Sequence, residues 1–293
     1  MAEFCVCVFF NLAAGVRQGG VLSPLLFAIF INDIVDRVQA ANVGCHISNI
    51  CACIFLYADD ILLVSPTVTG LQTLLHICEN ELANLDMQLN VKKSMCMRFG
   101  PMFDSEVVEL VSLCGSVLKW VDSCRYLGVF FVSGRSFKCS ISNAKSRFYR
   151  AFNAIFSKIG RSASEETVLT LLKSKCLPIL LYATEACPLL SRDFSSLEFS
   201  LTRLFMKLFC TGSAAVVVEC QRNFAFLPIK LQVRIRTARF LQMFAVSENS
   251  VCSLFTLKAS LQLHNIFESV DSSITTACQL RNFIYEQFTS PSR

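Results

Sequence analysis

Several features are scarce in this sequence of 293 residues. It has only 11 glycines and 7 prolines, while 53% of its residues are hydrophobic and 26 are phenylalanine. That composition excludes a disordered chain, a collagen-like repeat and a coiled-coil rod. No apolar stretch reaches the roughly 20 residues that a membrane helix requires, so we expect no membrane partner. The chain should instead fold around one large or two modest hydrophobic cores.

Zinc and export signals are also missing. The sequence has 16 cysteines but no Cys-x-x-Cys pair, and His46, His76 and His264 are far apart. We therefore expect no zinc site and interpret the cysteines as reduced thiols that fill the core. The apolar run at residues 4–14 follows Glu3 and lacks the basic start of a secretion signal. These features predict an intracellular protein, nuclear or cytoplasmic, that is not secreted.

Charge and periodicity divide the chain near Ser133. Residues 1–133 contain 7 basic and 12 acidic side chains, whereas residues 134–293 contain 20 basic and 10 acidic ones. Short apolar runs typical of strands dominate the first part, and apolar residues at helical spacing dominate the second. We predict an α+β domain over 1–133 and an all-helical domain over 134–293.

The same patterns give the expected elements. In the first part we predict strands over 4–12, 50–57, 61–64, 95–99, 107–113, 118–121 and 126–132. A largely buried helix should begin at Ser23 and Pro24 and continue to Val38, and another should cover about 69–86. In the second part we predict helices over 140–159, 164–177, 193–210, 228–246 and 251–267.

Two adjacent carboxylates, Asp59 and Asp60, stand between two apolar runs, a pattern typical of a β-hairpin. Adjacent carboxylates repel each other unless a cation neutralises them, and a site of oxygen ligands alone favours Mg²⁺ or Mn²⁺. The alternative is an ordinary turn, in which aspartate is common.

Two other segments allow both a functional and a structural interpretation. The loop at 15–20 offers backbone N–H groups beside Arg17 and Gln18 that could meet a phosphate or a base edge. Equally, its glycines could simply let the chain turn before a helix. Lys92 and Lys93 follow a predicted helix, where the default is a solvated surface pair.

Taken in order, four motifs resemble those of a known family. They cover residues 15–24, 55–60, 89–94 and 125–128 and read GVRQGGVLSP, FLYADD, LNVKKS and RYLG. Their order and approximate spacing resemble the reverse transcriptases of LINE-type, non-LTR retrotransposons. The resemblance covers about residues 4–190. It implies a polymerase palm, an antiparallel sheet with packed helices, followed by a helical thumb and connection.

The resemblance also implies a function, RNA-directed DNA polymerisation, with an RNA template, a DNA primer and dNTP as partners and Mg²⁺ or Mn²⁺ as cofactor. Asp59 and Asp60 would be the catalytic metal ligands. Lys93 would be near the triphosphate and could protonate the leaving group. The substrate-binding residues implied are Arg17, Gln18, Gly19, Gly20, Tyr57, Tyr126, Leu127 and Gly128.

A stretch without acidic residues opens the second part. Residues 134–164 contain seven basic side chains and no acid, with Phe148, Tyr149, Phe152 and Phe156 interleaved. A helix there could bury its aromatic face and offer the other to the phosphates of a primer and template duplex. A solvated basic face is the alternative. The predicted nucleic-acid-binding residues are Lys138, Lys145, Arg147, Arg150, Lys158 and Arg161.

The family's catalytic centre also requires a third carboxylate, on a strand upstream of the glycine-rich loop. Glu3 is the only acidic residue before that loop in this sequence. We therefore expect a truncated palm and a chain that does not polymerise DNA unaided. The alternative is a catalytically inactive, retroelement-derived protein that binds nucleic acid through its basic helix. A third hypothesis is an unstable, aggregating product.

Overall fold

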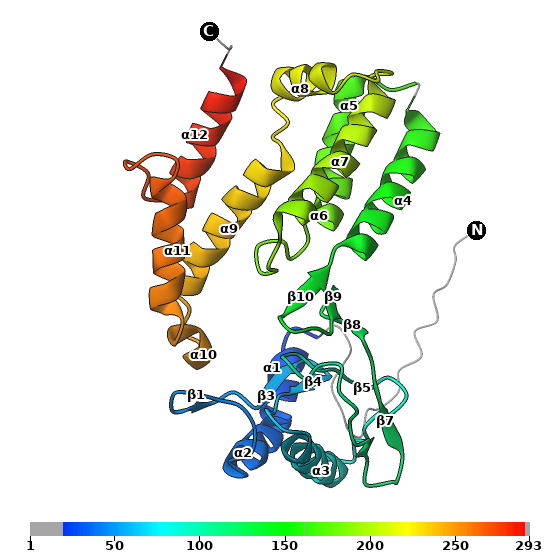
Figure 1. The fold of residues 1–293 in the computed structure, drawn as a ribbon, viewed down its shortest axis with the longest axis vertical. Helices are drawn as coiled ribbons and strands as arrows, with labels where there is room; N and C mark the ends of the chain where they lie inside the picture. The colour runs from blue at the N-terminus through cyan, green and yellow to red at the C-terminus, as the bar shows by residue number, and fades with distance from the viewer. Residues whose placement is uncertain (1–19, 161, 291–293) are drawn as a thin grey trace, which may run out of the picture. The chain divides into compact units, whose positions relative to one another are not determined.

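The computed structural model describes residues 20–160 and 162–290 (Figure 1). These residues form two compact units. The first contains the residues up to 95 together with 107–119, and the second contains 96–106 together with the residues from 120 onward. The architecture is mixed α and β, with small antiparallel sheets, as an α+β fold class predicts.

Three helices and two hairpins make up most of the first unit. Their bounds are α1 Ser23–Phe30, α2 Asn32–Ala40, β1 His46–Ile47, β2 Ile50–Cys51, β3 Ile54–Tyr57, β4 Asp60–Leu63 and α3 Val68–Asn84. The core of this unit includes apolar side chains from α2, β3 and α3 and from the residue that precedes β3, among them Ile34, Cys53 and Leu74, which are fully buried. The hydroxyl of Thr67 caps α3 by accepting a hydrogen bond from the N–H of Gly70 at 3.1 Å. The predicted helix over 69–86 is therefore confirmed.

The predicted helix from Ser23 to Val38 is wrong in two respects. It is broken at Ile31 into α1 and α2, and α1 has no buried residue. Among the residues of α1, only Phe27 packs against the core of the first unit. The apolar side chains of Leu25 and Ile29 remain exposed, because no other described element of this unit covers them.

Six short strands follow, with bounds β5 Met95–Cys96, β6 Leu110–Val111, β7 Val117–Trp120, β8 Ser123–Tyr126, β9 Val129–Val132 and β10 Lys138–Ser140. Strands β5, β7 and β6 form one small sheet, and β10, β9 and β8 form another. The single strand predicted over 126–132 is wrong, because the chain turns at Leu127 and Gly128 and returns as β9. The boundary predicted after Ser133 falls between β9 and β10, which pair inside the second unit.

Helices make up the rest of the second unit. Their bounds are α4 Ser142–Ile159, α5 Glu165–Leu171, the π-helical turn η1 Leu172–Cys176, α6 Leu177–Leu180, α7 Ser191–Leu208, α8 Ala214–Asn223, α9 Ile229–Ala245, α10 Ser250–Ser253, α11 Thr256–Glu268 and α12 Ala277–Thr289. The segments predicted at 140–159, 164–177, 193–210, 228–246 and 251–267 are helical over most of their length. Helices α8 and α12 were not expected.

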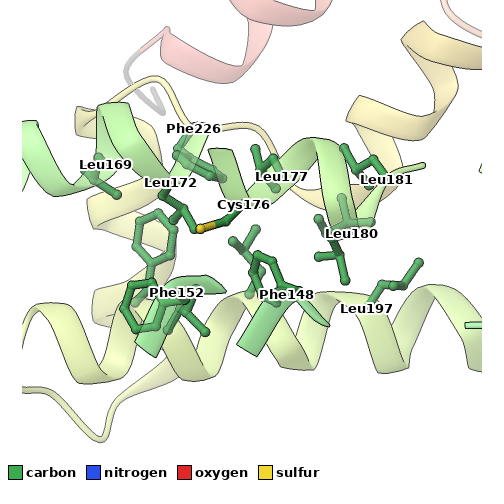
Figure 2. Packing of buried hydrophobic residues seen from close by; sticks show 14 of the residues in the cluster. Phe148, Phe152, Leu169, Leu172, Cys176, Leu177, Leu180, Leu181, Leu197 and Phe226 are labelled. Carbon is green, nitrogen blue, oxygen red and sulfur yellow. The ribbon is translucent and has the colours of Figure 1, made fainter. Parts of the chain in front are cut away.

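Two apolar clusters hold these helices together. The larger one joins α4, the α5–η1–α6 segment and α7, and its buried side chains include Phe148, Phe152 and Cys176 (Figure 2). Helices α9, α11 and α12 enclose the smaller one, centred on Ala238 and Leu280, both fully buried. Burial of this kind supplies most of the stability of amphipathic helices.

The described cysteines are all free thiols. Four of them fill core space as predicted, Cys53, Cys78, Cys96 and Cys176. The interpretation is wrong for three others, which are exposed: Cys114, Cys210 and Cys278. Within residues 20–160 and 162–290, none of the helices has the length and apolar character needed to cross a membrane.

Candidate active site and nucleic-acid interface

The two adjacent aspartates lie at the tip of the β3–β4 hairpin. Tyr57 pairs with Asp60, so Ala58 and Asp59 form a two-residue turn. Ala58 has a φ of 53°, in the left-handed region that tight hairpin turns require. The two apolar runs on either side of a polar centre therefore predicted this hairpin correctly.

The two faces of the hairpin differ in burial. Side chains directly opposite each other on paired strands point to the same face. Leu56 and its partner Ile61 pack against the core of the first unit. Tyr57 and Asp60 occupy the other face, where the side chain of Tyr57 is 63% exposed. The core side thus fixes the register, and this register presents Asp60 and Tyr57 together to solvent.

Both carboxylates are available for a ligand. Asp59 and Asp60 are exposed, and their side chains form no hydrogen bond or ion pair with any other described residue. Their oxygens are the kind of ligand that Mg²⁺ and Mn²⁺ prefer. Within the described part of the chain, no third carboxylate, histidine or cysteine joins them to complete a group of three.

Lys93 lies in a turn of the same unit. Its backbone N–H donates to the carbonyl oxygen of Asn90 at 3.0 Å, and the hydroxyl of Ser94 donates to the same oxygen at 3.0 Å. These bonds fix the backbone of the turn and leave the Lys93 side chain exposed.

Most of the glycine-rich loop lies outside the described residues. This applies to the predicted contacts Arg17, Gln18 and Gly19, and to the predicted strand at 4–12. Gly20 is described, and its carbonyl oxygen accepts the N–H of Ser23 at 3.3 Å at the start of α1.

The predicted primer-contacting residues Tyr126, Leu127 and Gly128 belong to the second unit. Leu127 and Gly128 form the turn between β8 and β9, with φ values of 46° and 83°. The Tyr126 ring packs against that of Phe131, with 6.3 Å between ring centroids. These three residues thus lie together in one turn of the second unit, whereas the hairpin of Asp59 and Asp60 belongs to the first unit.

Helix α4 has the two faces that the sequence predicted. Phe148 and Phe152 are fully buried, whereas the side chains of Arg147, Arg150 and Lys158 are exposed. Of the other predicted nucleic-acid contacts, Lys138 is exposed in β10 and Arg161 lies outside the described residues. Lys145 is partly buried, and its ammonium donates to the Ser196 hydroxyl at 2.6 Å. The ammonium of Lys145 therefore already donates one hydrogen bond within the protein.

Sequence reasoning missed two cations on α7, Arg203 and Lys207. They are four residues apart, so they lie on one side of the helix. Lys207 reaches α4, where its ammonium donates to the side-chain oxygen of Asn153 at 3.1 Å. Their i, i+4 spacing on a predicted helix could have indicated a basic patch. They were missed because they lie outside residues 134–164, the segment without acidic residues.

Part of the chain is similar to a known protein family. Residues 7–131 match the family described as "Reverse transcriptase (RNA-dependent DNA polymerase)". This segment includes the hairpin, α3 and the turn of Lys93, so these elements lie in the part of the chain that is similar to reverse transcriptases.

Two relatives from Drosophila melanogaster are similar to this chain. The chain is 31% identical over 137 residues to the "Retrovirus-related Pol polyprotein from type-2 retrotransposable element R2DM". It is 27% identical over 143 residues to the "RNA-directed DNA polymerase from mobile element jockey". The matches cover 44% and 47% of this chain but only 13% and 15% of the relatives. The resemblance to reverse transcriptases of non-LTR retrotransposons is confirmed.

Proposed function

We propose that the β3–β4 hairpin is the metal-binding part of an RNA-directed DNA polymerase centre. The observation that carries this proposal is the pair of exposed carboxylates at the tip of the hairpin, which have no partner among the described residues and lie in the segment that matches reverse transcriptases. Domains of this family generally use divalent metal ions. A turn that served only to reverse the chain would not need two adjacent like charges.

In this proposal Asp59 and Asp60 hold Mg²⁺ or Mn²⁺. Cations held there would stabilise the attacking and leaving oxygens of phosphoryl transfer. Tyr57 shares the exposed face of Asp60 and would contact the incoming dNTP or the primer end. The exposed ammonium of Lys93 would neutralise the triphosphate and donate a proton to the leaving pyrophosphate.

The substrates follow from the same assignment. They are an RNA template, a DNA primer and dNTP, with Arg17, Gln18, Gly19 and Gly20 as template and nucleotide contacts. The turn Tyr126–Leu127–Gly128 would contact the primer, and the helices from α4 onward would act as the thumb. A chain that works on these substrates would reside in the nucleus or cytoplasm.

The experiment is primer extension on an RNA template with Mg²⁺. The sequence predicts that this chain does not polymerise DNA unaided, whereas the enzymatic proposal requires extension by the wild type. If the wild type extends the primer, Asp59→Asn and Asp60→Asn should each reduce extension at least about 100-fold, because each removes a charged ligand. The matched control is Asp104→Asn, since Asp104 is another exposed aspartate in the described chain. Equal activity in the wild type and both hairpin variants, or no extension by the wild type, would refute the enzymatic proposal for this chain.

A second candidate is binding of a primer and template duplex without catalysis. It is favoured by α4, a helix of 18 residues with no acidic side chain and with Arg147, Arg150 and Lys158 exposed. Such a face should bind phosphates and lose affinity steeply as salt increases. Charge reversal at these three residues should abolish binding, whereas Asp59→Asn should leave it unchanged. Binding that does not depend on salt would exclude this candidate.

A further inference from the structure

A groove in the second unit has no assigned role. It has a volume of about 440 Å³ and lies between α4, α7 and the loop that follows α7. Its floor includes the buried side chains of Phe152 and Leu204, and its rim carries Tyr149, Arg203 and Lys207. The volume falls in the range typical of small-ligand pockets, so the groove can hold about one nucleotide.

The groove is rich in hydrogen-bond donors. Lys207 uses one N–H on Asn153 and lies 4.9 Å from the centre of the Phe156 ring, which leaves other N–H groups for a ligand. The Arg203 guanidinium lies 6.0 Å from the Phe199 ring and forms no ion pair within the described part of the chain. The hydroxyl of Tyr149 also forms no hydrogen bond to another described residue.

No acidic side chain lines the groove. Helix α4 contains no acid, and both carboxylates of α7 have other partners. Asp193 accepts the N–H of Leu190 at 2.9 Å, and Glu198 accepts the N–H of Ile229 at 2.7 Å. Two cations beside unoccupied donors and no acid favour an anionic ligand.

Features around the groove specify the anion further. Tyr149 is partly buried and packs against the core of the second unit, and the part of its ring that lines the groove offers a surface on which an unpaired base can stack. Arg150 and Asn153 are neighbours on α4, so exposed positive charge continues from the groove along the helix. A ligand with repeated phosphates and unpaired bases matches both features. A base-paired duplex would keep its bases from the ring.

We propose that this groove binds the backbone of single-stranded nucleic acid, with Arg203 and Lys207 contacting phosphates and Tyr149 stacking on a base. This site is distinct from the Asp59 and Asp60 hairpin and does not rest on polymerase activity. It adds a single-strand contact to the exposed face of α4, which is proposed to hold a duplex.

The test is fluorescence anisotropy with a labelled single-stranded oligodeoxythymidine. The variant Arg203→Gln/Lys207→Gln should bind at least about 10-fold more weakly. It should also lower the slope of log affinity against log salt by about 1.4, since each phosphate contact on a single strand contributes about 0.7. The matched control is Arg239→Gln/Lys258→Gln, which removes two exposed charges from α9 and α11 and should keep the wild-type slope.

Further variants separate binding from folding. Arg203→Lys/Lys207→Arg retains both charges and should bind within about threefold of the wild type, and circular dichroism should show helix content equal to that of the wild type. A single-stranded oligomer of abasic residues should bind more weakly than oligodeoxythymidine, because it has no base to stack on Tyr149. A folded Gln variant with wild-type affinity and slope would overturn the proposal. So would equal competition by a duplex or by polyglutamate.

The outcome also distinguishes this site from the catalytic proposal. Asp59→Asn should bind the oligonucleotide as the wild type does. If primer extension fails while the salt slope still depends on Arg203 and Lys207, the catalytic proposal is refuted and the groove is supported.

Discussion

The hydroxyl of Tyr182 donates a hydrogen bond of 2.9 Å to the carbonyl oxygen of Leu127. The bond joins the loop after α6 to the turn between β8 and β9. A Cβ atom added to Gly128 in that turn would approach the Tyr182 ring to 3.0 Å. The tyrosine therefore supports the turn and also limits which residue can follow Leu127.

Replacement of Gly128 tests this relationship. Gly128→Ala should lower the free energy of unfolding by about 2–3 kcal/mol, because it adds left-handed strain to a steric conflict. The control Gly115→Ala shares a positive φ, 79°, but its Cβ would meet nothing within 4 Å. It should cost only about 1 kcal/mol. Urea denaturation measures both, and equal losses would show that the contact with Tyr182 contributes nothing.

Local pattern in the sequence predicted the elements that depend on periodicity. The spacing of Leu71, Leu74, Leu75, Cys78 and Leu82 predicted the apolar face of α3, and all of them are buried except Leu71, which is half-buried. A hairpin with Ala58, Asp59 and Asp60 between its strands followed from the apolar runs on either side, although Asp60 already belongs to β4. In both cases the signal lies within a few consecutive turns or strands.

Glu198 gives a prediction about pH. Burial raises the pKa of this carboxyl, although the hydrogen bond from the Ile229 N–H partly offsets that effect. Because the pKa is higher in the folded than in the unfolded state, the folded state binds more protons between the two values. The contribution of Glu198 to stability therefore falls as pH rises from about 4 towards neutrality.

Glu198→Gln keeps an oxygen for the Ile229 N–H and removes the titration. The stability of the variant relative to the wild type should therefore increase from acidic to neutral pH, as measured by thermal melts. Glu219→Gln on the exposed surface of α8 is the control and should show a flatter difference. A difference for Glu198→Gln that falls as pH rises would contradict this interpretation.

Cysteine reactivity should differ strongly along the chain. Hydrogen bonds with Ser112 and Ser116 lower the pKa of the exposed Cys114 thiol, whereas burial raises the pKa of Cys78 and of Cys96 to about 11. Because the thiolate is the nucleophile, iodoacetamide near pH 8 should alkylate Cys114 at least about 100-fold faster than the other two. Peptide mass spectrometry measures the rates of alkylation, and Ser116→Ala should slow the alkylation of Cys114. Equal rates would show that the buried thiols are accessible.

A two-point ion pair should stabilise the second unit. Arg236 donates to Glu185 through Nη2 at 2.9 Å and through Nε at 3.1 Å, and the Glu185 side chain is only 22% exposed. Glu185→Gln should therefore cost about 1–2 kcal/mol of unfolding free energy. The exposed pair of Arg222 and Glu219, at 3.9 Å, provides the contrast, and Glu219→Gln should cost no more than about 0.5 kcal/mol. Chemical denaturation at two salt concentrations checks both values.

Contacts between residues distant in sequence could not be predicted. The pairs Lys145 with Ser196, Lys207 with Asn153 and Arg236 with Glu185 each join residues more than 50 positions apart. Periodicity gives the buried face of a helix but not the helix that covers it, which is why the groove beside Lys207 was missed. By contrast, the start of α12 carried a local signal, the capping box of Thr276 and Gln279, that was overlooked.

Metal binding at the hairpin can be measured without catalysis. Asp59 and Asp60 form no hydrogen bond or ion pair with another described residue, and a bound cation would offset the repulsion between their adjacent charges. We expect Mn²⁺ to bind the wild type in a titration followed by electron paramagnetic resonance, and to raise its melting temperature. Free ion at 100 times its dissociation constant would add about 2.7 kcal/mol.

Asp59→Asn/Asp60→Asn should abolish that shift while leaving the metal-free protein as stable as the wild type or more so by up to about 0.5 kcal/mol, because two adjacent like charges are removed. The control Asp104→Asn/Glu106→Gln removes two exposed carboxylates elsewhere and should retain both Mn²⁺ binding and the melting shift. Loss of binding in both variants would point to general attraction by negative charge. Retention in both would show that the hairpin carboxylates do not hold the ion.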